Sequence, residues 1–254
     1  MKLWVASIAI AALSATVLAQ DNGDQYGSKY QDPDNLPAQV DGGHGQTGYN
    51  DCVKRYGSSS SKARCKNAFI NSVQDFCLFS VPDPNETVGN QEANVVSYCT
   101  LSGRGTRLIP AGTIHGAHFV RTPGFVQISG TGDLTKLKVQ RGDQGGELDP
   151  HGATGAGNPN GGLVFTNVRG KYERLSQWNS FISYQEFCMR ACFNAPDAGK
   201  RCPHIYDTEG CQFSDAGNYD AGVFEDCEGE NGKYVSPHGH RSWVLPGCPE
   251  TDFF

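Results

Sequence analysis

Short hydrophobic runs recur through the middle of the chain, each bounded by Gly, Pro or polar residues. Such runs are typical of β-strands when they are rich in β-branched and aromatic side chains. Five of them predict strands, at residues 106–109, 114–120, 125–129, 134–139 and 163–166. A Gly-rich loop, residues 142–162, separates the last two. We therefore predict an α+β domain that is mainly β, with an antiparallel sandwich or barrel-like core.

Helices are predicted on both flanks of this core. Hydrophobic residues recur at the spacing of one helical face over residues 62–79, and a shorter helix is predicted at 92–98. After the core, Ser183 and Glu186 have the spacing of a capping box, which predicts a helix through residues 187–192.

The first 19 residues have the pattern of a secretory signal peptide. Lys2 precedes a mainly apolar run over residues 3–18, and the small residues Val17 and Ala19 precede the expected cleavage point. Residues 20–50 offer few aliphatic side chains to bury, so we expect a flexible leader there. Residues 51–254 are expected to form a single disulfide-rich globular domain.

An even number of cysteines in a secreted chain indicates a disulfide framework. If residues 62–79 form one helix, Cys65 and Cys77 lie roughly 18 Å apart along its axis, which is too far for a disulfide. Cys52–Cys65 and Cys77–Cys99 are then the natural local pairs. The ten cysteines of the chain are Cys52, Cys65, Cys77, Cys99, Cys188, Cys192, Cys202, Cys211, Cys227 and Cys248.

In the second flank, Cys188 and Cys192 are one helical turn apart and are expected to face the same neighbouring segment. Their available partners are Cys202, Cys211 and Cys227. We read this spacing as structural, because redox motifs use a shorter one at a helix N-terminus. The tail is expected to be tied down through Cys248.

Charge and hydropathy narrow the range of partners. The formal net charge is −6, and the chain lacks a cluster of Lys and Arg, which argues against nucleic acid and an anionic membrane surface. After the signal peptide no apolar run is long enough to span a membrane. Asn85 begins the only N-glycosylation sequon. We therefore expect a soluble, secreted, extracellular glycoprotein.

The Gly-rich loop contains the strongest candidates for chemistry. Pro150 favours an extended Asp149, so Asp149 and His151 are expected to project to one side, close to Glu147. With His118 from a nearby strand, these side chains form a candidate ligand site, and His118, Asp149 and His151 are weak candidates for a metal. The structural alternative is that His118 caps a strand and that Asp149 supports a turn. No cofactor is expected.

Carbohydrate recognition would also need aromatic faces for sugar rings. The candidates are Trp178, Tyr184, Tyr206, Tyr219 and Trp243, although such residues more often belong to the core. Glu147 and Asp149 could in principle act as a glycosidase pair, but nothing in the sequence fixes their separation.

Four motifs resemble those of a known family. They are GTRLIP at 105–110, HFV at 118–120, GGELDPHG at 145–152 and YDAGVFE at 219–225. The chain resembles the secreted macrophage-activating glycoproteins of basidiomycetes and is similar to an immunoreactive cryptococcal mannoprotein. The resemblance implies a fungal, secreted, glycosylated and disulfide-bonded protein with no catalytic residues to carry over. Several members look to carry a Ser/Thr-rich, lipid-anchored tail, and its lack here favours release.

From these observations we expect a non-catalytic fungal glycoprotein that acts at the cell wall or in host interaction. The alternative is a polysaccharide-binding or polysaccharide-active protein that uses the loop at residues 142–162. That alternative requires the loop to line a groove with exposed aromatic side chains.

Overall fold

A computed structural model describes residues 26–41, 45–205, 209–231, 233–234 and 243–244. Its helices are short: α1 is Cys52–Tyr56, α2 Val88–Gln91, α3 Ala198–Arg201 and α4 Cys211–Ser214, with a 3-10 helix, η1, at Leu134–Leu137. The strands are β1 (Asn67–Phe69), β2 (Cys77–Ser80), β3 (Val96–Cys99), β4 (Arg107–Leu108), β5 (Ile114–Arg121), β6 (Phe125–Gly132), β7 (Gly146–Leu148), β8 (Leu163–Thr166), β9 (Glu173–Leu175), β10 (Gln177–Ile182), β11 (Glu186–Cys192), β12 (Phe224–Glu228), β13 (Lys233–Tyr234) and β14 (Trp243–Val244).

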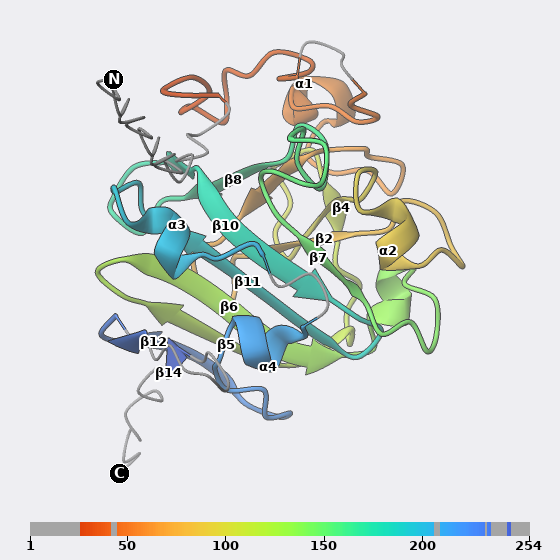
Figure 1. Ribbon diagram of the computed structural model, residues 1–254. Helices are drawn as coiled ribbons and strands as arrows, with labels where there is room; N and C mark the ends of the chain where they lie inside the picture. Colours follow the sequence, from red (N-terminus) through yellow and green to blue (C-terminus); the bar gives the residue numbers. More distant parts are fainter. Residues whose placement is uncertain (1–25, 42–44, 206–208, 232, 235–242, 245–254) are drawn as a thin grey trace, which may run out of the picture.

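A six-stranded sheet with the order β12-β5-β6-β11-β10-β7 forms the centre of the molecule. Its neighbouring strands are antiparallel except for β12, which runs parallel to β5. Figure 1 shows this sheet crossing the molecule, with α3 and α4 on one side and β2 and β4 on the other. We call the face toward β2 the inner face and the face toward α3 and α4 the outer face.

The inner face packs against two three-stranded sheets, β1-β8-β9 and β2-β3-β4. The contact is aromatic: the rings of Phe76 and Phe187 stack with centroids 5.8 Å apart, and those of Phe79 and Trp178 lie 5.6 Å apart. Because β12 and β7 are free edges of the large sheet in the described order, the sheets form a sandwich and do not close into a barrel. The prediction of a mainly β fold is confirmed.

Successive side chains along each strand point to opposite faces of the sheet. Those on the outer face include polar groups, and segments joined to the sheet by disulfides cover them. The fully buried side chains of Arg190 (β11) and Asp215 approach to 3.4 Å between Nε and Oδ1. Arg190 Nε also donates to Gln127 Oε1, and Asn179 Nδ2 donates to Asp215 Oδ1. Burial raises the pKa of Asp215, and the Arg190 charge opposes that shift.

Three of the predicted strands are confirmed, since residues 114–120, 125–129 and 163–166 lie within β5, β6 and β8, while 106–109 contains only the two-residue β4. The predicted strand at 134–139 is wrong because η1 occupies its first four residues. All of these segments are rich in hydrophobic residues, and local pattern does not distinguish a buried strand from a short helical turn.

The predicted helices at 62–79, 92–98 and 187–192 are wrong. β1 lies within the first segment and β2 begins in it, β3 begins in the second, and β11 contains the third. Both β2 and β3 are buried at all four positions, so their sequences lack the polar alternation of a half-exposed strand. The Ser183 side chain accepts the backbone N–H groups of Gln185 and Glu186, which makes a turn between β10 and β11 in place of a helix cap.

The cysteine pairs agree with the prediction, although residues 62–79 do not form the helix from which it was argued. Cys52–Cys65, Cys77–Cys99, Cys188–Cys211 and Cys192–Cys202 are disulfides. Cys77 and Cys99 face each other directly across β2 and β3. Cys227 is also disulfide-bonded, and Cys248 lies outside the described residues.

Part of the segment for which we expected a leader packs against this domain. Val40 is buried, and Tyr26, Tyr30 and Leu36 lie against the hydrophobic core. The expected signal peptide, residues 1–19, lies outside the described residues. Within the described part of the chain, every helix is too short to cross a bilayer.

The outer-face ion pair predicts a large loss of stability when one partner is removed. Arg190→Met leaves Asp215 buried without its cation, so we expect the free energy of unfolding to fall by about 3–5 kcal/mol. Urea unfolding of the oxidised protein measures this change. The double variant Arg190→Met/Asp215→Asn removes both charges and should lose less than the single variant. A single-variant loss below about 1 kcal/mol would contradict the role given to this pair.

Candidate functional site

His118 lies on the outer face of β5 and is 1% exposed. Its Nδ1 lies 2.7 Å from Glu225 Oε1 on β12, and its Nε2 lies 3.1 Å from the backbone oxygen of Asp220. The ring thereby connects β5 with the chain segment that leads into β12. His118 lies within β5 and does not cap it, so these contacts differ from the strand cap considered from the sequence.

The Gly-rich loop predicted at residues 142–162 contains β7, and Asp149 builds the turn that follows this strand. Its Oδ1 accepts the backbone N–H groups of His151 (2.6 Å) and Gly152 (2.8 Å). Asp149 also exchanges two backbone hydrogen bonds with Asn158, which closes the loop at its base. The side chain thus supports the turn, as in the structural alternative from the sequence.

Glu147 and His151 lie on either side of Asp149. Glu147 is buried in β7, opposite Phe181 of β10. The His151 ring stacks on His204 with centroids 4.1 Å apart, and its Nε2 lies 3.2 Å from Gln177 Oε1. In the part of the chain that the structure describes, no three His, Cys, Asp or Glu residues gather as metal ligands would.

The structure separates His118 from the other three candidates. β5 and β7 are four strand positions apart in the sheet, which corresponds to roughly 19 Å. His118 therefore does not share one small ligand with Asp149 and His151. Of the four candidates, only Glu147, Asp149 and His151 lie at the same edge of the sheet.

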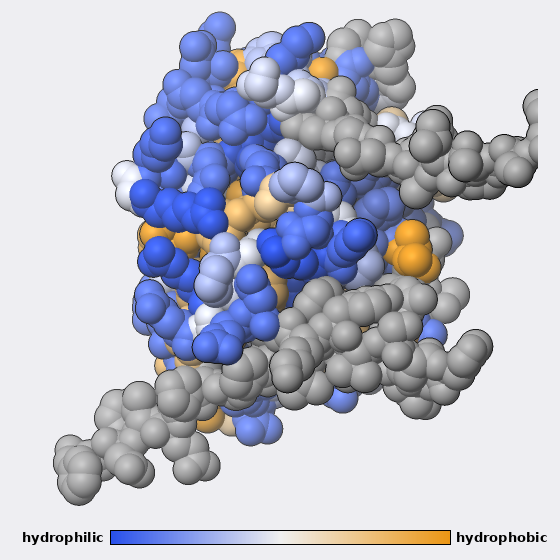
Figure 2. Space-filling model, turned by 60° about the vertical axis from the view of Figure 1, so that its left-hand side comes forward, coloured by the Kyte–Doolittle hydropathy of each residue, from blue (hydrophilic) through white to orange (hydrophobic). Residues whose placement is uncertain are grey.

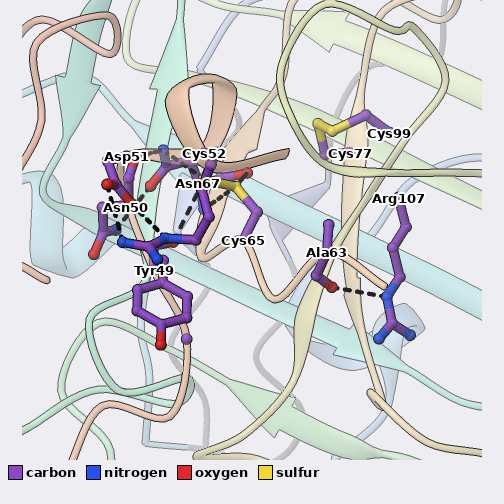
Figure 3. The surroundings of a disulfide bond; sticks show 12 residues. Tyr49, Asn50, Asp51, Cys52, Ala63, Cys65, Asn67, Cys77, Cys99 and Arg107 are labelled. Atoms are coloured by element: carbon purple, nitrogen blue, oxygen red, sulfur yellow. Dashed lines mark hydrogen bonds and ion pairs between the residues drawn. A yellow bond between two sulfur atoms is a disulfide. The ribbon is translucent and has the colours of Figure 1, made fainter. Parts of the chain in front are cut away.

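A network of buried side-chain amides fixes the far end of the loop. Asn50 Nδ2 donates to Asn67 Oδ1 at 2.8 Å and to the backbone oxygen of Gly161 at 2.9 Å. Gln46 Nε2 donates to Asn50 Oδ1 at 2.7 Å. Figure 3 shows Asn50 and Asn67 beside the Cys52–Cys65 disulfide. This amide network joins residues 46–52, β1 and the loop.

Lys66 lies next to this network with no exposed surface. Its Nζ donates to the backbone oxygens of Val95 (2.8 Å) and Ala93 (3.3 Å). The N–H of Asn160 in the loop donates to the same Ala93 oxygen. Burial lowers the pKa of Lys66 to about 7, because removing the ammonium from solvent disfavours its charged form.

A groove of about 610 Å³ lies between the loop and the N-terminal segment. One wall comes from residues 26–41 and the other from residues 154–160. The groove is lined by Tyr26, Lys29, Tyr30, Val40, Asp41, Thr154, Gly155, Ala156 and Asn160.

The amide network holds both walls of this groove. Gln46 Oε1 accepts the N–H groups of Val40 (3.2 Å) and Asp41 (3.4 Å), while Asp41 Oδ2 accepts the N–H of Gln46. Through Asn50, the same network bonds Gly161 at the end of the loop wall. The two walls are therefore fixed relative to each other.

The three aromatic candidates whose side chains the structure describes, Trp178, Tyr184 and Tyr219, are not among the residues that line the groove. Trp178 is buried in the core, Tyr219 donates its hydroxyl to the backbone oxygen of Asp215, and Tyr184 packs against the core. Tyr206 and the side chain of Trp243 lie outside the described part of the structure. Sequence analysis missed Tyr26 and Tyr30 because both belong to the expected leader. Their spacing of four residues was the signal that could have identified them.

The surface in view in Figure 2 is mainly hydrophilic, with hydrophobic residues in small separate areas. A surface of this kind suits polar contacts better than the burial of a broad apolar face.

The turn at Asp149 generates a local prediction. Asp149→Ala removes the side-chain acceptor of two part-buried hydrogen bonds from backbone N–H groups, so we expect the free energy of unfolding to fall by about 1–3 kcal/mol. Hydrogen exchange at the amides of His151 and Gly152 should accelerate. Asp149→Asn retains an Oδ1 acceptor and serves as the matched control. Unchanged exchange in the alanine variant would contradict the assigned role of Asp149.

Lys66 generates a prediction about pH. The folded state binds the Lys66 proton more weakly than the unfolded chain, so stability rises with pH between about 7 and the unfolded pKa near 10.5. Relative to Lys66→Met, the wild-type free energy of unfolding should rise by about 2 kcal/mol from pH 7 to pH 9. Urea unfolding at both pH values measures the difference. Equal changes in the two proteins would show that the ammonium is not desolvated.

Comparison with known proteins identifies two relatives. The chain is 56% identical over 215 residues to appressorium protein ROW2 of Mycosarcoma maydis, covering 84% of this chain and 74% of ROW2. It is 48% identical over 196 residues to appressorium protein ROW1 of the same fungus, covering 76% of this chain but 45% of ROW1. No family model and no solved structure matches the chain. At this identity and coverage, the chain belongs to the family of fungal proteins that includes ROW2 and ROW1.

Proposed function

We propose that this protein is secreted by a fungus and acts at the cell surface or in contact with a host. The observation that carries the proposal is the family membership, because both relatives are appressorium proteins. An appressorium is the cell with which a fungus enters its host. A domain with four disulfides among its described residues suits the oxidising conditions outside the cell.

The protein acts by binding and not by turnover. The Asp149 carboxylate accepts hydrogen bonds from two backbone N–H groups. These bonds support a role in shaping the loop rather than a role in acid-base chemistry. His118 connects β5 to the approach to β12 and is 1% exposed, which supports a role in folding. We therefore do not propose Glu147 and Asp149 as the two carboxyl groups of a glycosidase.

Asn85 is the proposed site of glycosylation. It is exposed and lies in the turn before α2. Glycosylation there would agree with the sequence resemblance to macrophage-activating glycoproteins and mannoproteins. The expected signal peptide at residues 1–19 would supply the route to the glycosylation machinery.

A second candidate function is polysaccharide binding. The specific observation in its favour is that the Gly-rich loop lines a groove together with two tyrosines, Tyr26 and Tyr30. This groove uses residues 154–160 of the loop and not the candidate residues His118, Glu147, Asp149 and His151.

Expression of the full chain with a C-terminal tag in a basidiomycete tests the proposal. We expect the protein in the culture medium or the wall fraction, with a glycan that endoglycosidase removes. Asn85→Gln should abolish the glycan, whereas Asn90→Gln, an exposed asparagine outside the sequon, should retain it. Intact protein confined to the cytosol would contradict the proposed location.

A further inference from the structure

We propose that the groove between residues 26–41 and 154–160 binds a neutral oligosaccharide. The inference rests on the proposed extracellular function and adds a ligand class and a site to it. At about 610 Å³, the groove has a volume within the range of small-molecule sites, roughly 300–1,000 Å³.

The lining combines aromatic rings with short polar groups, which is the combination that a sugar needs. Tyr26 and Tyr30 form an edge-to-face pair with ring centroids 5.5 Å apart. Sugar C–H groups pack on aromatic faces, and the hydroxyls of the same ring need hydrogen-bond partners. Thr154, Asn160 and the exposed backbone of Gly155 supply such partners on the opposite wall.

The charges in the groove favour a neutral ligand. Lys29 and Asp41 both line it, so the two formal charges offset each other. Asp41 is also committed to the backbone N–H of Gln46, which limits its use for binding a cation. A polyanionic or polycationic partner would call for a groove in which one sign of charge predominates.

Both tyrosines are held in place before any ligand binds. The Arg174 guanidinium lies 5.6 Å from the centre of the Tyr26 ring and donates to the backbone oxygen of Gly27. Together with the amide network, these contacts reduce the entropy that binding would cost, because the walls are already ordered.

Tyr30 adopts an unusual backbone conformation for its residue type. Its φ is +60°, in the left-handed region that favours Gly and Asn. Backbone preference alone would select Gly at this position. Because Tyr30 lines the groove, a tyrosine at this position is consistent with a requirement for its side chain there.

This conformation allows a test that separates binding from folding. Tyr30→Gly removes the ring and fits the backbone, whereas Tyr30→Phe retains an aromatic face. Phe224→Ala is the matched control, because Phe224 is 55% exposed on β12, away from the groove. Thr154→Arg places a long side chain in the groove from the other wall and provides a second variant should Tyr30→Gly fail to fold.

Isothermal titration of the full, deglycosylated protein with laminarihexaose, cellohexaose and chitohexaose measures the affinity. We expect binding of at least one of these probes at millimolar concentration or below. Tyr30→Gly and Thr154→Arg should weaken it at least about tenfold, equivalent to about 1.4 kcal/mol. Tyr30→Phe and Phe224→Ala should change it less than about threefold. Preference for laminarihexaose would indicate a fungal wall glucan, and preference for cellohexaose a plant glucan.

No heat with any of the three probes at 10 mM would overturn the proposal, as would binding that Tyr30→Gly and Thr154→Arg leave unchanged. These outcomes are separable from failure of the proposed function, because location outside the cell is measured independently of affinity for the sugar probes.

Discussion

The six-stranded sheet has to be covered on both faces, and the two faces are covered by different means. Two small sheets close the inner face through hydrophobic and aromatic packing, with Phe76 on Phe187 and Phe79 against Trp178. The outer face carries the buried Arg190–Asp215 pair, and two disulfides tie its cover to β11. A hydrophobic layer tolerates substitutions by side chains of similar shape. A buried ion pair is stable only when both of its partners are present. The edge of this sheet at β7 is the base from which the Gly-rich loop extends.

How much of this fold could be predicted depended on whether each segment carries a local signal. β5, β6 and β8 were predicted because turn-forming residues bound their hydrophobic runs. β11 and the segment containing β1 and the start of β2 were predicted as helices. Strands covered on both faces lose the alternation that identifies them, and the spacing of Phe69, Val73 and Phe76 matches a helix by coincidence. The Cys52–Cys65 and Cys77–Cys99 pairs were predicted because neighbouring cysteines could be paired locally, whereas the sequence left the partners of Cys188 and Cys192 open.

The candidate site was predictable in its loop but not in its surroundings. Composition alone singled out residues 142–162, and proline and aspartate chemistry anticipated the turn at Asp149. The distance from His118 depends on strand order, which one sequence does not reveal. The groove depends on contacts such as the one between Asn50 and Gly161, which are 111 residues apart in the chain. Tyr26 and Tyr30 entered the site only because such contacts fold the expected leader against the domain.

The polar residues at the base of the loop thus hold the loop in place, and the proposed ligand contacts lie in the groove at its tip. The most direct test is a map of backbone amide chemical shifts during titration of the full protein with laminarihexaose, cellohexaose or chitohexaose. The account predicts changes concentrated in residues 26–41 and 152–161, with the signals of His118 and Glu147 unchanged. Changes centred on His118 or Glu147, or an unchanged spectrum with every probe, would contradict it.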